Sequence, residues 1–172
     1  MFVKKLFLLN FFLLILVLPL RVNGGSMFGF LDVCLFSEVN GVVTLKSSPV
    51  SGAKVIQVAK FDDKEYTNET MTDANGAFYF KPMYTRSVRQ FFPVSTSISQ
   101  NIIIQYDDKT YEAWRTLKAD FELNSELNES TTGNVIAINL QCDLENKNLT
   151  RRGAYGNAVM GICTWEGQQV VK

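Results

Sequence analysis

Short runs of β-branched and aromatic residues, separated by clusters of Gly, Pro, Asn and Asp, make up most of the chain after residue 24. The clearest run is NVIAINLQCD at 134–143, where side chains alternate between an apolar set and a mixed set. Alternation with a period of two is typical of a strand with one buried face. Helical periodicity of useful length is missing from the same region. The pattern therefore predicts an all-β fold.

Seven strands are expected from this spacing, and together they predict an antiparallel seven-stranded Greek-key sandwich. Their ranges are 35–45, 53–61, 66–72, 77–81, 101–106, 110–117 and 134–143. The segment 82–100 is expected to be irregular, with one helical turn over 86–92 that ends before Pro93. Gly41, inside the first strand, suggests a bulge or bend.

Turn chemistry separates these strands. Asp62-Asp63 and Asp107-Asp108 are expected to be solvated turn residues rather than paired catalytic carboxylates, which need burial. Asp73-Ala74-Asn75-Gly76 predicts a tight turn with a positive φ. It resembles a calcium loop only superficially, because position twelve is Tyr84 instead of Glu. The acidic stretch 118–133 is expected to be a mobile loop.

The N-terminus has the organisation of a secretory signal. Lys4 and Lys5 precede an apolar run over 6–20, and Val22-Asn23-Gly24 places small residues at a cleavage point. An uncleaved membrane anchor is the alternative, but the run is shorter than the ~20 residues that a spanning helix needs. We therefore expect 1–24 to be a signal peptide, 25–143 a β-sandwich, and 144–172 a tail docked on it.

Cleavage after Gly24 would leave 148 residues with 14 basic and 17 acidic side chains, a net charge of −3. Such a charge argues against nucleic acid or an anionic membrane as the main partner. The whole chain contains no histidine, which excludes Ser-His-Asp and Cys-His centres and HExxH zinc sites. We expect no catalytic, cofactor-binding or metal-binding residues, and no enzyme activity.

Three cysteines remain after the leader, and export would place them in an oxidising compartment. One disulfide and one free thiol are expected. Of the three pairings, Cys142–Cys163 closes a short loop and pins the tail, whereas the main alternative, Cys34–Cys163, ties the two ends of the domain together. Cys34, if unpaired, is expected to be a buried structural thiol.

Three segments carry a family resemblance: Val39–Leu45 (VNGVVTL), Ser48–Val55 (SPVSGAKV) and Thr72–Phe78 (TDANGAF). In this order they resemble the carboxypeptidase regulatory-like, or transthyretin-like, domain. The mature chain is also similar to a group of small exported bacterial proteins, which supplies no activity to transfer. The transthyretin-like enzymes that hydrolyse 5-hydroxyisourate rely on histidines, so the resemblance implies a fold rather than that activity.

These observations favour an exported, monomeric, non-enzymatic protein of the periplasm or the extracellular space. Its role would be recognition or structural, with another envelope or secreted protein as partner. The alternative is a periplasmic immunity protein that blocks a secreted toxin, for which an exposed acidic patch at 120–129 would be suited to a basic partner.

The segment 84–93 is the most suggestive binding surface. It combines Arg86 and Arg89 with Phe91 and Phe92, and loops of arginine and aromatic residues often supply the hot spots of protein contacts. The alternative is that both phenylalanines plug an open end of the sandwich.

Export predicts that the precursor is cleaved near Gly24. The intact mass of the exported protein should then correspond to 148 residues or to within a few of that number. A full-length species held in the inner membrane would contradict this prediction.

Overall fold

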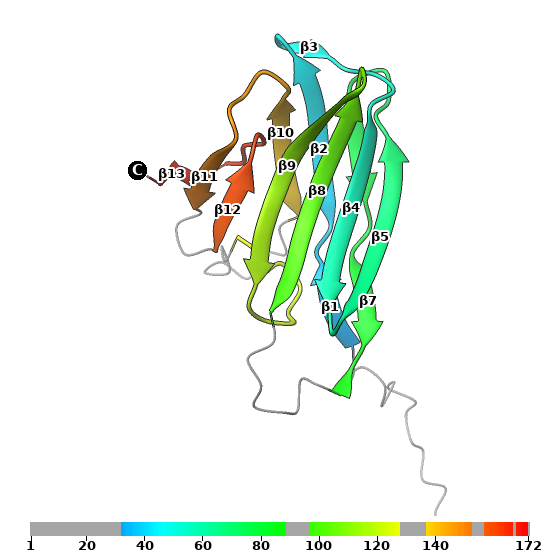
Figure 1. Ribbon diagram of the computed structural model, residues 1–172, viewed down its shortest axis with the longest axis vertical. Coiled ribbons are helices and arrows are strands. Elements are labelled where there is room, and N and C mark those ends of the chain that lie inside the picture. The colour runs from blue at the N-terminus through cyan, green and yellow to red at the C-terminus, as the bar shows by residue number, and fades with distance from the viewer. Residues whose placement is uncertain (1–31, 89–96, 128–136, 153–156, 167, 172) are drawn as a thin grey trace, which may run out of the picture. The chain divides into compact units, whose positions relative to one another are not determined.

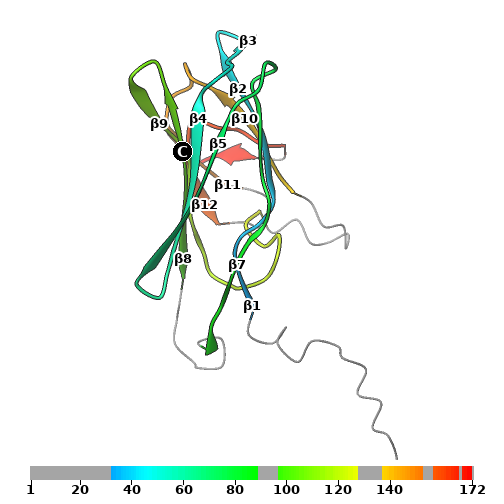
Figure 2. The same ribbon diagram turned by 90° about the vertical axis from the view of Figure 1, so that its right-hand side faces the viewer.

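The computed structural model describes residues 32–88, 97–127, 137–152, 157–166 and 168–171. From residue 32 onward they belong to one compact unit built of β-strands. Two sheets form the layers of a Greek-key β-sandwich, as the alternation predicted. Figure 1 looks onto the larger sheet, and Figure 2 shows the two layers from the side.

Thirteen strands are formed by the described residues. Their bounds are β1 (Asp32–Phe36), β2 (Val39–Leu45), β3 (Ser48–Pro49), β4 (Lys54–Phe61), β5 (Lys64–Met71), β6 (Ala77–Phe80), β7 (Met83–Arg86), β8 (Ile98–Tyr106), β9 (Lys109–Lys118), β10 (Ile138–Asp143), β11 (Leu149–Arg152), β12 (Ala158–Gly161) and β13 (Gln169–Val170). The large sheet has the order β13-β11-β12-β9-β8-β4-β5. The small sheet has the order β10-β2-β3, with β6 also paired to β2, and β1 and β7 form a separate ribbon.

The predicted all-β antiparallel sandwich is confirmed, but the number of strands and one pairing differ from the prediction. Strands such as β3 and β13 have only two residues, too few for alternation to be visible. In addition, β10 runs parallel to β2 over six residue pairs, from Ile138↔Val39 to Asp143↔Thr44. Parallel partners lie far apart in sequence, so no local turn signal announces them.

Two other local expectations also fail. The range 35–45 is not one strand, because the chain leaves β1 at Phe36 and begins β2 at Val39. The segment expected to be irregular contains β7, which ends at Arg86. Most of the helical turn expected over 86–92 lies outside the described residues. Residues 89–96 lie outside the described part of the chain.

Three two-residue hairpins have positive φ at both central residues, which is typical of type I′ turns. Asp62 and Asp63 (φ 53° and 59°) connect β4 to β5, and Asp107 and Asp108 (φ 51° and 57°) connect β8 to β9. These are the two Asp pairs expected to be turns. The third hairpin, between β2 and β3, turns at Lys46-Ser47.

The core lies between the two sheets and follows the alternation of each strand. Trp114 of β9 is fully buried and meets Trp165 edge to face, with ring centroids 5.4 Å apart. The same core contains many β-branched and leucine side chains: Val33, Leu35, Val39, Val43, Val55, Ile98, Ile102, Ile104, Ile138 and Leu140. Burial of this apolar surface is the main favourable term in folding.

Gly41 does not form the bulge that its place in the strand suggested. Its register is regular, opposite Leu140 on one side and Phe78 on the other. A Cβ at this position would lie 2.2 Å from Cζ of Phe78. The glycine therefore makes room for a core aromatic ring.

The tail beyond residue 143 docks on the sandwich by adding β11, β12 and β13 to the large sheet. Cys142 of β10 forms a disulfide with Cys163, which follows β12, and Cys34 is left free. Beside this bond, the backbones of Gln141 and Thr164 exchange two hydrogen bonds of 2.8 Å. The tail is thus fixed to both sheets, covalently and by hydrogen bonds.

The turn before β6 generates a prediction about Gly76. Gly76 and Gly52 both have positive φ (73° and 76°), but only at Gly76 would a Cβ meet backbone, 2.3 Å from the carbonyl oxygen of Val43. We expect Gly52→Ala to cost about 1 kcal/mol for its left-handed backbone. Gly76→Ala should cost roughly 1–3 kcal/mol more because of the overlap. Urea unfolding of both variants measures the difference, and equal losses would show that the contact with Val43 is unimportant.

Candidate functional site

The structure describes only one of the four residues expected to bind a partner. Arg86 is exposed at the end of β7, opposite Asp32 of β1, and its Nε lies 3.4 Å from Oδ1 of that residue. Because both side chains are largely exposed, the pair contributes little to stability. Arg89, Phe91 and Phe92 lie outside the described residues.

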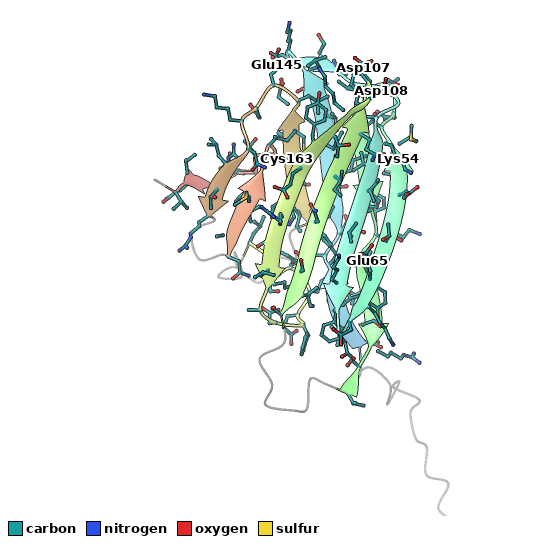
Figure 3. All side chains as sticks on the ribbon, viewed as in Figure 1. Lys54, Glu65, Asp107, Asp108, Glu145 and Cys163 are labelled. Atoms are coloured by element: carbon teal, nitrogen blue, oxygen red, sulfur yellow. A yellow bond between two sulfur atoms is a disulfide. The ribbon has the colours of Figure 1, made fainter. Side chains whose placement is uncertain are left out.

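The carboxylate pairs that could have suggested acid–base chemistry are turn residues. Figure 3 shows Asp107 and Asp108 at the tip of the β8–β9 hairpin, at the same end of the molecule as Glu145. Asp73 is also used locally, because its Oδ1 accepts from the backbone N–H groups of Asn75 (2.8 Å) and Ala77 (2.9 Å). Within the described ranges, no group of three His, Cys, Asp or Glu side chains is arranged to hold a metal ion.

A buried polar cluster, absent from the sequence predictions, is centred on Glu126. The carboxylate of Glu126 is fully buried and accepts four hydrogen bonds. Ser37 donates two of these, from its backbone N–H (2.9 Å) and its hydroxyl (2.6 Å). Gln100 Nε2 donates at 2.8 Å and Lys118 Nζ at 3.3 Å. A charge removed from water requires such partners.

Lys118 completes the cluster from the end of β9. Its side chain is fully buried, and Nζ donates to the carbonyl oxygen of Glu122 as well as to Glu126. The Ser37 hydroxyl also accepts from the backbone N–H of Asn124 at 2.7 Å. These bonds hold the segment 119–127 against β1, β8 and β9.

The acidic segment 120–129, whose exposure would favour the immunity alternative, is exposed only in part. Glu126 lies in the core, while Asp120 and Glu122 remain exposed. Phe121 also packs inward, edge to face with Phe61 at a centroid distance of 5.6 Å. Residues 128 and 129 lie outside the described part of the chain.

Cys34 borders the cluster, with its Sγ 4.0 Å from the Ser37 hydroxyl. Burial raises the pKa of the Cys34 thiol, with a smaller raising effect from Glu126, and the nearby Lys118 ammonium opposes both. The thiol is therefore protonated and a poor nucleophile at neutral pH. The structure places Cys34 as the buried, unpaired cysteine that was expected.

A surface groove of about 600 Å³ lies over the outer face of the small sheet. Adjacent register positions form its first row, Asn139 of β10, Asn40 of β2 and Tyr79 of β6. The second row consists of Gln141, Val42 and Ala77 on the same three strands. Val42 and Ala77 are short, so the face is hollow between the amides and the tyrosine ring.

Comparison with known proteins places the chain in a family without assigning it an activity. A family model described as a domain of unknown function, DUF6795, matches residues 39–147, more than half of the chain. The chain belongs to this family. The matched region spans β2 to β10 and so contains the groove, Gln100, Lys118 and Glu126. No match was found among curated proteins or among solved structures.

The buried cluster generates a prediction about stability. Lys118→Met would leave the Glu126 carboxylate without its cation in the core, which should cost about 3–5 kcal/mol. Lys118→Met combined with Glu126→Gln should lose less than the sum of the two single variants, because the double variant contains no unpaired charge. Urea unfolding of the wild type, both single variants and the double variant gives the coupling energy.

The exposed pair Lys60–Glu65, with Nζ 2.9 Å from Oε2, is the matched control. Lys60→Met should change stability by less than about 1 kcal/mol. If Lys118→Met were equally mild, or the two losses simply added, Glu126 and Lys118 would not form the coupled buried pair described above.

Proposed function

We propose that this chain is an exported, non-enzymatic β-sandwich protein with a recognition or structural role in the bacterial envelope. Its location would be the periplasm or the extracellular space. Support for export comes from the N-terminal pattern, in which Lys4 and Lys5 precede the apolar run 6–20. The Cys142–Cys163 disulfide is consistent with an oxidising compartment. In the described part of the chain, no helix is long and apolar enough to cross a membrane.

The non-enzymatic part of this proposal rests on the burial of the Glu126 cluster. Cys34, Ser37, Lys118 and Glu126 are the residue types from which a nucleophilic centre could be assembled. All four are buried, and the carboxylate and amine bond to groups of the protein itself. A substrate would have to displace the segment 119–127 to reach them. Their arrangement supports a role in holding the fold.

Recognition of another protein is supported by the resemblance to transthyretin-like domains, which are scaffolds on which loops vary. The ribbon of β1 and β7 presents Arg86 and Tyr84, both exposed, and leads into the segment that contains Arg89. A monomer that binds an envelope or secreted protein through this end is the simplest form of the proposal.

Replacing both arginines tests this proposal. Arg86→Ala with Arg89→Ala should leave the melting temperature nearly unchanged, since exposed charges contribute little to stability. Capture of a partner from envelope extract by the immobilised mature protein should fall by at least about tenfold if the arginines are hot spots.

Arg115→Ala is the matched control, because Arg115 is also exposed and ion-paired but lies on the outer face of β9. It should capture the partner as well as the wild type does.

The variant Phe91→Ala separates the two interpretations of the aromatic residues. If Phe91 fills the open end of the core, the variant should lose about 3–5 kcal/mol of stability. If Phe91 contacts the partner, the variant should lose binding at constant melting temperature. Unchanged capture by the double arginine variant would contradict the proposed binding surface.

A further inference from the structure

The groove over the small sheet has the chemistry of a site for a neutral, hydroxyl-rich ligand. Its volume, about 600 Å³, lies within the ~300–1,000 Å³ that is typical of ligand pockets. Most such pockets are apolar, but here two asparagines and a glutamine supply planar amides, each with a donor and an acceptor. Adjacent hydroxyls of a sugar ring pair with this donor–acceptor combination.

An aromatic residue stands beside the amides. Tyr79 remains 45% exposed although it belongs to a regular strand, so a broad ring face is available to a ligand. Met71 at the end of β5 also lines the groove, is 56% exposed and adds apolar surface. An apolar ring face can pack against the C–H groups of a sugar while its hydroxyls bond to the amides.

The charges around the groove restrict the ligand further. Among the described residues that line it there is no Lys or Arg, and Asp73 is the charged member. Glu38 lies nearby and accepts from Asn40 Nδ2 at 3.4 Å. An anionic polysaccharide would meet these carboxylates without a compensating cation, so the groove disfavours it.

The groove is also preorganised, which reduces the entropy lost on binding. Asn40 and Asn139 each donate through Nδ2 to a protein acceptor, the second to the carbonyl oxygen of Ala137 at 3.2 Å. Its floor is the regular β6-β2-β10 pairing, with Phe78 and Leu140 packed into the core beneath.

We propose that the β6-β2-β10 face, with Tyr79 and the amides of Asn40, Asn139 and Gln141, binds a neutral oligosaccharide chain. This inference rests on the proposed recognition role and names a ligand class for it. The groove is open to solvent, so the ends of a longer polymer could extend beyond it.

Titration of the ¹⁵N-labelled mature protein with three oligosaccharides tests the inference by NMR. Cellohexaose and chitohexaose are the neutral probes, and hexagalacturonate is the acidic one. At least one neutral probe, at millimolar concentration, should shift the amide resonances of β2, β6 and β10 in a saturable manner. The acidic probe should not shift them.

Tyr79→Ala with Gln141→Ala should weaken binding by at least about tenfold and leave the melting temperature nearly unchanged, because both side chains lie outside the core. Tyr84→Ala is the matched control, since this tyrosine is similarly exposed (51%) but lies on β7, away from the groove. It should bind as the wild type does.

The inference would be overturned if neither neutral probe shifted any resonance, or if the shifts were confined to other strands. It would also be overturned if the groove resonances shifted with protein concentration in the absence of sugar, because a second copy of the chain would then be the occupant. None of these results affects capture of a protein through Arg86 and Arg89. Failure of the sugar experiment is therefore distinguishable from failure of the proposed function.

Discussion

The burial of one carboxylate, that of Glu126, determines how one end of the sandwich is built. A charge taken out of water must be compensated by close donors, and here they come from three separate parts of the chain, at Ser37, Gln100 and Lys118. The break between β1 and β2 occurs at the serine, and the segment after β9 folds back over the sheet to deliver the carboxylate. The two sheets and this segment are therefore mutually dependent.

On the outer faces, polar groups are exposed to water and need no hydrogen-bond partner within the protein. There the small sheet carries amides and a tyrosine around a hollow, and the β1–β7 ribbon carries an exposed arginine. The core uses its reactive groups to hold the fold, and this arrangement supports the proposal of a binding role. The disulfide between Cys142 and Cys163 contributes by fixing the tail to the small sheet.

Local pattern predicted much of this fold, because strands and turns have local causes. The Asp pairs adopt the turn conformations that their side chains favour, and Gly76 adopts a positive φ because it has no Cβ. The parallel pairing of β10 with β2 and the Glu126 cluster were missed because they join residues far apart in sequence. A signal was present nevertheless: Gln100 and Lys118 fall at inward positions, in phase with Ile98 and Trp114. Polar residues at such positions require a buried partner.

Cysteine mapping tests the central claim about this compact unit. The claim is that the Cys142–Cys163 disulfide joins the tail to the small sheet and that Cys34 is buried beside the Glu126 cluster. The folded protein is treated with iodoacetamide and digested without reduction, and the peptides are identified by mass spectrometry. The account predicts one cross-linked pair containing Cys142 and Cys163, with Cys34 modified only after the protein is unfolded. A cross-link that contains Cys34, or modification of Cys34 as fast in the folded as in the unfolded protein, would contradict it.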